Sequence, residues 1–290
     1  MTTTTPPSTL KPIRSAAILI IGDEILNGKI LDTNSYHFAR FCFNNLAIPL
    51  KRTIVCGDDE LDIKNSLDVL LKQDKVDFVV TSGGLGSTHD DITYQVLASY
   101  FNLDYKLDEE VVKKMHSLRD GYLSTLSKDQ LGAFYRMATL PVASKDSPIS
   151  TKNLFFDEKL WFPILEIDQS VYVLPGVPQL FTQLLNDMEP FLKRRVAPTN
   201  LSRRYVVTKT GETQLAPYLT RLQQDCIAKH GEGVVKLGSY PHMDSKVNTI
   251  SIIGKDLENP SVLNGIVGDL IENVGGDAKE ISQEEEDKLR

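Results

Sequence analysis

Cysteine is scarce in this sequence of 290 residues. Cys42, Cys56 and Cys226 lie far apart, and no C-x-x-C pair is present. So few isolated thiols argue against a disulfide framework and against a structural zinc site. Apolar runs are all far shorter than the roughly 20 residues of a membrane-spanning helix, and the N-terminal segment lacks the apolar core of a secretory signal. We therefore expect a cytoplasmic protein with no membrane partner, and the nucleus is an alternative location.

Positive charge is also in short supply. Lys and Arg number 32 against 39 Asp and Glu, which gives a net charge of −7 and a pI near 5.3. Such a balance disfavours general binding to the phosphate backbone of nucleic acid. No Gly-x-x-Gly loop of the KH type with basic neighbours is placed between two helices, and the G-x-S-x-G elbow of acyl hydrolases and the Gly-Lys-Ser/Thr ending of a P-loop are missing. We expect neither nucleic-acid binding nor nucleophilic acyl chemistry.

Three strand–turn–helix units follow one another from Ser15. The apolar strands read AAILII, LKRTIVC and DFVVTS, and each is followed by a helix-forming segment with apolar residues at helical spacing. Continuous apolar strands joined through helices are typical of a parallel sheet covered on both faces. The sequence predicts an α/β fold, a three-layer α/β/α domain with a mostly parallel sheet.

Composition divides the chain into four parts. We expect a disordered tail at 1–14, the α/β domain at 15–197 and a small α+β domain of order β-α-β-β-α at 201–277, followed by a charged tail at 278–290. The segment VAPTN reads as the linker between the two domains. We expect the small domain to pack against a second copy of the chain, in a homo-oligomer, or to cover the active cleft.

The stretch VVTSGGLGSTHDD, residues 79–91, joins the third strand to a glycine-rich turn. Such turns offer main-chain N–H groups to anions such as phosphate. The alternative is a turn needed only for chain reversal. The stretch ends in Asp90 and Asp91, and one aspartate there could cap the following helix, which leaves the second without a structural role.

Acidic residues also follow the first two strands. Because the ends of parallel strands meet at one edge of a sheet, these carboxylates should gather there, although each alone could be a helix-start residue. Like charges a few ångströms apart repel by several kcal/mol, and a divalent cation such as Mg²⁺ relieves that repulsion while admitting an anionic ligand. The seven candidates are Asp23, Glu24, Asp58, Asp59, Glu60, Asp90 and Asp91, of which Asp23, Glu24, Asp58 and Asp91 are the predicted metal ligands.

Three further positions are candidates for substrate contact. Asn27 and Asn34 flank the first acidic turn and could bind a polar ring or a ribose, although capping a helix is the simpler reading of Asn34. The stiff turn LPGVP, with Gly176 and Pro178, follows a strand and could line the ligand site.

Several segments in fixed order resemble the molybdopterin-binding-like domain of the competence/damage-inducible protein A family. They are GDEILNGKILDTNSYHFA, VCGDDELDIKNSL and VVTSGGLGSTHDDITYQVLA, and MATLP and LPGVP resemble two later landmarks. The similarity covers about Ile18 to Arg195. The same domain forms the N-terminal part of eukaryotic FAD synthases. The family's Gly-x-Ala-Pro-Gly turn is replaced here by TKNLFFDEKLWFPIL, which leaves the far wall of the pocket undefined.

The resemblance implies an enzyme that hydrolyses the pyrophosphate of FAD to FMN and AMP, and that also acts on ADP-ribose and related dinucleotides. It implies K⁺ together with a divalent cation, Mg²⁺ or Co²⁺. Asp58 and Asp91 match the two functional aspartates of the molybdopterin adenylyltransferases, and Asp90 completes the predicted catalytic set. The predicted substrate-binding residues of the loop are Gly83, Gly84, Leu85, Gly86, Ser87 and Thr88, and the main-chain N–H groups of 84–87 are expected to hold one phosphate.

Two other functions fit the same residues. A molybdopterin adenylyltransferase would form a pyrophosphate bond instead of cleaving one. A non-catalytic flavin- or pterin-binding protein would use the loop for binding alone.

Overall fold

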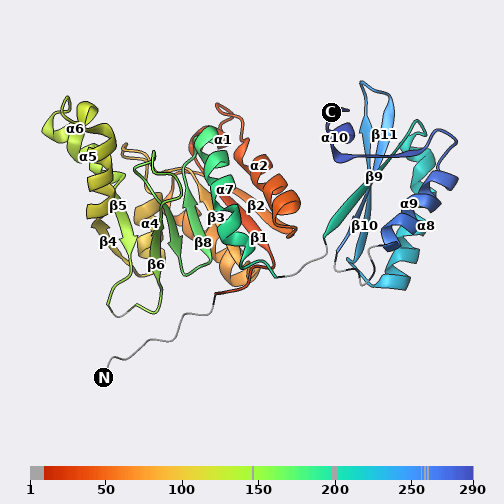
Figure 1. Cartoon of the computed structure of the whole chain (residues 1–290), viewed down its shortest axis with the longest axis horizontal. Helices are drawn as coiled ribbons and strands as arrows, with labels where there is room; N and C mark the ends of the chain where they lie inside the picture. Colours follow the sequence, from red (N-terminus) through yellow and green to blue (C-terminus); the bar gives the residue numbers. More distant parts are fainter. Residues whose placement is uncertain are drawn as a thin grey trace. The chain divides into compact units, whose positions relative to one another are not determined.

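The computed structural model describes residues 10–145, 147–197, 201–255, 257, 259 and 261–289. The chain divides into two compact units, 1–197 and 198–290 (Figure 1). This division falls at the segment that the sequence predicted as a linker. Each unit has its own apolar core.

The first unit is built on a six-stranded sheet of order β2-β1-β3-β8-β7-β6. The first four strands are parallel neighbours, and β7 and β6 extend one edge as antiparallel strands. The predicted mostly parallel sheet is therefore confirmed. The strands are β1 (Ala16–Ile21), β2 (Leu50–Cys56), β3 (Phe78–Ser82), β6 (Thr151–Leu154), β7 (Ile164–Ile167) and β8 (Val171–Leu174).

Helices cover both faces of this sheet, as burial along β1 shows. Ala17, Leu19 and Ile21 belong to one core cluster, whereas the intervening Ile18 and Ile20 belong to the other. Each fully buried aliphatic side chain contributes roughly 1.5–3 kcal/mol, so both faces stabilise the fold. The first cluster packs against α3 (Glu60–Asp68), η2 (Val69–Gln73), α4 (Thr93–Tyr100) and α5 (Glu109–Leu123); the second packs against α2 (Asn34–Arg40), η1 (Phe41–Asn45) and α7 (Pro178–Lys193).

Two antiparallel strand pairs were missing from the sequence prediction. One is the β6–β7 pair, and the other is a separate two-stranded sheet of β4 (Asp104–Leu107) and β5 (Thr139–Val142). Between β4 and β5 lie α5 and α6 (Lys128–Arg136), which project from the sheet in Figure 1. A short helix, α1 (Asp23–Leu26), follows β1 directly.

The predicted disordered tail at 1–14 is wrong for its last residues, and residues 1–9 lie outside the described part. Ile13 is completely buried in the second core cluster, and its N–H donates to the carbonyl of Arg195 at 2.8 Å. Ile13 also forms a parallel bridge with Val196. The segment before β1 is thus tied to the last residues of the same unit.

The second unit is an antiparallel sheet of order β10-β11-β9-β12 with two long helices on one face. The predicted charged tail at 278–290 is wrong in part, because β12 pairs with β9 and the side chains of Ile281 and Glu286 are buried. Packing on a second copy stays a prediction. The elements are β9 (Ser202–Thr208), α8 (Glu212–His230), β10 (Val235–His242), β11 (Val247–Gly254), α9 (Ser261–Asn273), β12 (Lys279–Ile281) and α10 (Gln283–Asp287).

Within the described residues, no helix has the length and apolar character needed to cross a membrane.

Candidate active site

The carboxyl ends of β1 and β2 lie side by side, because the two strands are parallel neighbours paired up to Ile21 and Cys56. The main-chain N–H of Asp23 donates to Oδ2 of Asp58 at 3.0 Å, and the N–H of Asp58 donates to Oδ1 of Asp23 at 3.4 Å. This reciprocal pair fixes both carboxylates where the strands end. The predicted convergence of acidic groups is present at this edge.

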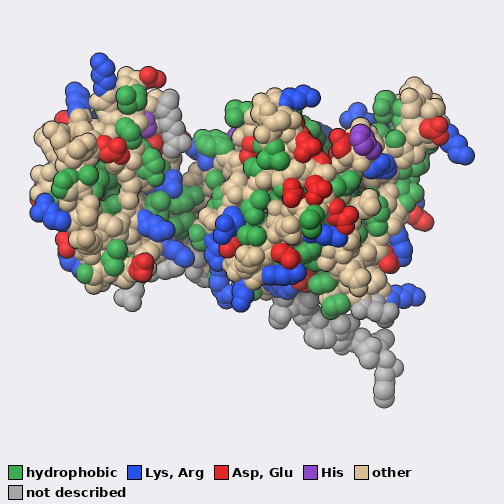
Figure 2. Space-filling view, turned by 180° about the vertical axis from the view of Figure 1, so that it is seen from behind, with side chains coloured by type: hydrophobic (Ala, Val, Ile, Leu, Met, Phe, Trp, Pro, Cys, Tyr) green, Lys and Arg blue, Asp and Glu red, His purple; other side chains and the backbone are tan. Residues whose placement is uncertain are grey.

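Burial raises the pKa of Asp58 above its ordinary value. The N–H of Asp23 opposes the shift, while the negative charges of Asp23, Glu24 and Asp90 add to it. Carboxylates from all three strand ends therefore act on Asp58. Figure 2 shows acidic side chains gathered in the upper part of the larger unit, the end where Figure 1 places the strand-terminal α1.

Two of the seven candidate carboxylates serve helix α3 instead of this cluster. Asp59 is the N-cap, and its carboxylate accepts hydrogen bonds from the N–H groups of Leu61 and Asp62. Glu60 forms an ion pair with Lys64 one turn later at 2.6 Å. The expectation that every acidic residue after β2 faces the ligand is wrong for these two, and Asp58 alone faces the other strand ends.

The glycine loop after β3 requires glycine at two positions. Gly83 and Gly84 have φ values of 110° and 64°, which side chains rarely tolerate. A Cβ on Gly83 would lie 2.0 Å from the carbonyl oxygen of Ile21, and one on Gly84 would lie 2.3 Å from Oγ1 of Thr93. The loop therefore passes directly against the end of β1, beside the acidic cluster.

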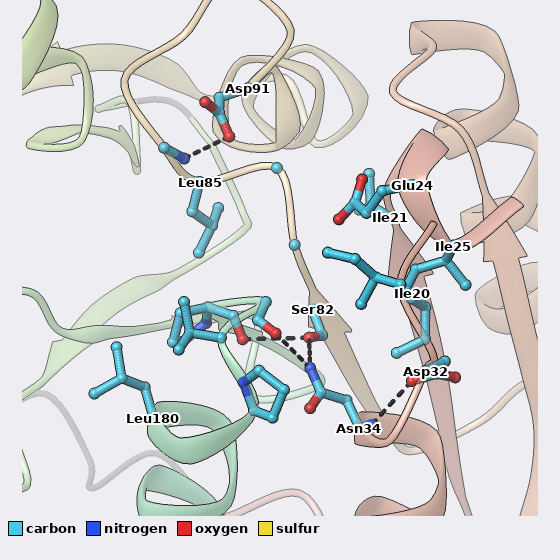
Figure 3. A pocket seen from close by; sticks show the side chains of 18 of the residues that line it. Ile20, Ile21, Glu24, Ile25, Asp32, Asn34, Ser82, Leu85, Asp91 and Leu180 are labelled. Atoms are coloured by element: carbon cyan, nitrogen blue, oxygen red, sulfur yellow. Dashed lines mark hydrogen bonds between the residues drawn. The ribbon is translucent and has the colours of Figure 1, made fainter. Parts of the chain in front are cut away.

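Asp91 closes this loop with its side chain. Its carboxylate accepts the N–H of Gly86 at 2.6 Å, the bond drawn in Figure 3. It also accepts the N–H of Thr88 at 2.9 Å and the Thr88 hydroxyl at 2.5 Å. The second aspartate of the stretch thus has a structural role that the sequence did not suggest. The N–H of Gly86, which was predicted to bind phosphate, is therefore occupied by Asp91.

Other main-chain amides of the loop are available. Within the described part of the chain, the N–H groups of Gly84, Leu85 and Ser87 donate to no acceptor. Unpaired amides at the end of a parallel strand are suited to an anion. Of the amides predicted to bind phosphate, only those of Gly84, Leu85 and Ser87 therefore stay candidates.

A cavity of about 540 Å³ opens beside the loop. The turn after β8 forms one side through Gly176 and Pro178, and the segment between α1 and α2 forms another (Figure 3). Apolar side chains supply most of the wall: Ile20, Ile21, Ile25, Ile30, Leu31, Leu85, Tyr94, Met137, Trp161, Phe162, Val177 and Leu180. Such a cavity is suited to a flat, mostly apolar ring.

Asn34 is a polar group in this wall, and it is 6% exposed. Its amide nitrogen donates to Oγ of Ser82 at 3.0 Å and to the carbonyl of Gly176 at 2.8 Å, whereas Oδ1 is buried without a partner in the described structure. The side chain of Asn34 does not cap α2; Thr33 is the N-cap residue, and the carboxylate of Asp32 accepts the first two main-chain N–H groups of the helix. A buried acceptor without a donor is costly, so a ligand donor is expected there.

The structure brings together most of the predicted site residues. Asp23, Asp58 and Asp90 form the acidic edge next to the cavity, and Ser87 and Thr88 continue the loop away from it. Asn27 does not line the cavity; it ends α1 and accepts the N–H of Lys29. The predicted residues that do line the cavity are Glu24, Asn34, Gly83, Gly84, Leu85, Gly86, Asp91, Gly176 and Pro178.

The aromatic wall is the part that sequence reasoning missed. Trp161 and Phe162 come from the segment between β6 and β7, where the family's usual turn is replaced. Their rings lie 5.1 Å apart, and Trp161 also packs against Phe134. One sequence feature could have pointed to this wall: Trp161 is the one tryptophan of the sequence, and it lies in an irregular segment rich in aromatic residues.

No group of three or more His, Cys, Asp or Glu side chains in the described part is arranged to enclose a metal ion. The acidic edge instead offers Asp58 with Asp23 and Glu24 nearby, none of them in an ion pair. Mg²⁺ is commonly held by one or two carboxylates together with substrate phosphates. The donor set fits that kind of shared site, with the substrate completing it.

A family model described as "Probable molybdopterin binding domain" matches residues 17–194. The chain belongs to this molybdopterin-binding domain family. Curated relatives include a "Probable FAD synthase" of Caenorhabditis elegans, 29% identical over 274 residues, 91% of this chain and 50% of the relative. The chain thus spans about half of that relative. A "CinA-like protein" of Gemmatimonas aurantiaca is 30% identical over 83% of this chain and 54% of its own length.

Among solved structures, CinA of Thermoplasma acidophilum matches with a TM-score of 0.52 and 28% identity, over 62% of this chain and 98% of that one. That protein is described as having an unknown function. Together with the CinA-like relatives, this match confirms the similarity to the competence/damage-inducible protein A family.

Proposed function

We propose that this protein hydrolyses the pyrophosphate bond of FAD to give FMN and AMP, with a divalent cation at the acidic edge. The observation that carries the proposal is the position of Asp58. Its carboxylate lies among Asp23, Glu24 and Asp90, with Oδ1 only 3.4 Å from where a Cβ on Gly84 would be. Carboxylates and free loop amides therefore face the same small volume beside an apolar cavity.

The cavity supports a substrate with a flat ring. Trp161, Phe162 and Tyr94 supply aromatic surface, and the unpaired Oδ1 of Asn34 can accept a hydrogen bond from a ring N–H or amino group. A flavin has such an imide N–H, and adenine has an amino group. A diphosphate joined to that ring would extend toward the free N–H groups of Gly84 and Leu85.

Hydrolysis requires attack of one water molecule on one phosphorus atom. The water oxygen bonds to that phosphorus, the bridging P–O bond breaks, and the second phosphate leaves with the bridging oxygen. Asp58 is the candidate base to accept the water proton, because its Oδ1 faces the loop, 3.4 Å from where a Cβ on Gly84 would be. A divalent cation, when bound by Asp58 and its neighbours, supplies charge neutralisation for the diphosphate.

Names of the relatives support a flavin dinucleotide. The two nematode relatives are called "Probable FAD synthase", and this chain covers 50% and 44% of their lengths. Cleavage of FAD by this chain is our own proposal, as is the use of Mg²⁺ or Co²⁺ with K⁺. ADP-ribose belongs to the same proposal, because it carries the same adenosine diphosphate part.

The family match favours one second candidate, transfer of an adenylyl group to a pterin. That reaction would place a pterin in the same cavity and would form the pyrophosphate bond. Binding of flavin or pterin without turnover is the third function that the experiment below distinguishes.

The test is incubation with FAD and Mg²⁺ or Co²⁺, with and without K⁺, followed by chromatography of the products. We expect FMN and AMP in equal amounts, and no product with EDTA. Asp58→Asn should lower turnover by about 10²–10⁴-fold, the usual contribution of a general base. Asp59→Asn is the matched control, because asparagine also caps a helix well and Asp59 faces α3. Unchanged FAD with every cation would refute the hydrolase.

A further inference from the structure

Trp161 and Phe162 form an aromatic corner in the cavity wall. Their ring centroids lie 5.1 Å apart, and their planes are inclined by 80°. Both side chains line the cavity and both are half-buried, so each keeps surface that a ligand can cover. Because the two planes are nearly perpendicular, a flat ligand stacked on one ring would meet the other edge-to-face, and both arrangements are favourable. An extended ring system can therefore contact both side chains at once.

The segment that carries the aromatic corner, residues 155–163, contains no helix or strand but is anchored on two sides. The ammonium group of Lys114 on α5 lies 4.5 Å from the ring centroid of Phe155. The carboxylate of Asp157 accepts a hydrogen bond of 2.7 Å from the side-chain amide of Gln183 on α7. Because α5 and α7 cover opposite faces of the sheet, the segment is held from both. A wall that is fixed before binding loses less conformational freedom when a ligand binds.

The size and polarity of the cavity distinguish between the two ring systems of FAD. A volume of about 540 Å³ is typical of sites that enclose a whole drug-sized ligand, and adenine alone would leave part of it empty. Adenine also carries nitrogen atoms around its perimeter, which lose hydrogen bonds against an apolar wall.

The isoalloxazine ring of a flavin has three fused rings and an apolar dimethylbenzene end. Ile30 and Leu31 line the same cavity and are 48% and 82% exposed. Their side chains offer apolar surface that such an end can cover, and covering it is favourable. The cavity therefore fits the isoalloxazine ring better than adenine.

We propose that the aromatic corner binds the isoalloxazine ring of FAD and makes the site prefer flavin dinucleotides to dinucleotides without a flavin, such as ADP-ribose. The inference rests on the proposed function for the identity of the substrate. It deepens that function by placing the flavin in the cavity and the adenosine part beyond the diphosphate, so that Trp161 and Phe162 determine specificity.

The experiment uses Trp161→Leu and Phe162→Leu, which remove a flat ring but keep an apolar side chain, and the conservative variant Trp161→Phe. Phe155→Leu is the matched control, because Phe155 is an aromatic residue of the same segment that does not line the cavity. Values of kcat/KM with FAD and with ADP-ribose are measured for each variant, together with calorimetric binding of FMN and of ADP in Mg²⁺.

We expect each leucine variant in the aromatic corner to weaken FMN binding and to lower kcat/KM for FAD by about 5- to 50-fold, as when an aromatic side chain stacked on a base is removed. The values for ADP-ribose and ADP should stay at the wild-type level, which also shows that the variants are folded. Trp161→Phe keeps a flat ring and should retain most of the FMN affinity. The control Phe155→Leu should leave the preference for FAD over ADP-ribose unchanged.

The wild-type protein provides a measurement that does not depend on the folding of variants. FMN should quench the fluorescence of Trp161 and ADP should not. Equal losses for FAD and ADP-ribose in the leucine variants, wild-type FMN affinity in both, or equal quenching by FMN and ADP would each overturn the inference. If FAD is not cleaved but FMN binding still depends on Trp161 and Phe162, the proposed function fails and this inference stands.

Discussion

Asp91→Asn tests whether the main role of Asp91 is to stabilise the glycine loop through its hydrogen bonds. The carboxylate accepts three hydrogen bonds, from the N–H groups of Gly86 and Thr88 and from the Thr88 hydroxyl. Asparagine has a similar shape but only one oxygen, so its amide nitrogen would face a donor. The variant therefore loses charge assistance at every bond and replaces one acceptor by a donor.

The expected cost follows from those contacts. Hydrogen bonds to charged groups contribute about 1.5–3 kcal/mol each in buried settings. Asp91 is half-buried, and asparagine keeps one acceptor, so we expect a net loss of about 2 kcal/mol in the free energy of unfolding. In a domain of this size, 1 kcal/mol shifts Tm by about 2–4 °C, which gives a fall of about 4–8 °C.

The assay is thermal unfolding without divalent ions, together with calorimetric titration of Mg²⁺ in the presence of AMP. Asp90→Asn is the control, since its side chain is 59% exposed. A lower Tm for Asp91→Asn alone supports the loop role. An unchanged Tm with a much weaker Mg²⁺ affinity would refute that reasoning and would make Asp91 a metal ligand first.

Three further predictions concern the same site. Asp58→Asn should raise the Tm at neutral pH without divalent ions, because the raised pKa of Asp58 means that the folded state disfavours its charged form. The gain in Tm should vanish as the pH falls through that pKa, where the wild-type carboxyl is protonated as well. A gain in Tm that is independent of pH would contradict this explanation. Gly84→Ala should lower the free energy of unfolding by about 1–3 kcal/mol more than Gly28→Ala. Both glycines have a positive φ, but only at Gly84 would the added Cβ clash with Thr93. Equal losses in urea unfolding would contradict this clash. FMN should quench the intrinsic tryptophan fluorescence of the wild-type protein, because Trp161 is the one tryptophan and lines the cavity, and Trp161→Phe is the variant that lacks this emission. A wild-type signal unaffected by saturating FMN would place the ring elsewhere.

Much of the first unit was predictable because its strands are buried on both faces. A run such as AAILII, stopped by a glycine, is typical of a strand buried on both faces, and parallel neighbours bring Asp23 and Asp58 to one edge. The hairpin of β6 and β7 was not predictable, since TKNL and ILEI are four residues each and depend on pairing across an irregular segment. Short strands of this kind are specified by tertiary contacts more than by local pattern.

The roles of individual polar residues were harder to predict than their location. Asp58 and Asp59 are adjacent, yet the main chain directs one to the neighbouring strand end and the other to the helix N-terminus. Asn34 looked like a helix cap, but the carboxylate of Asp32 accepts the first main-chain N–H groups of that helix, and Asn34 lies in the cavity wall. These outcomes depend on main-chain dihedral angles that residue type alone does not determine.

The most direct test is a crystal structure of the protein with Mn²⁺ and an FAD analogue whose bridging oxygen is replaced by a methylene group. We predict Mn²⁺ between Asp58 and the diphosphate, phosphate oxygens on the amides of Gly84 and Leu85, and the ring of the nucleotide against Trp161. A well-ordered analogue bound away from this edge, with no metal at Asp58, would contradict the account.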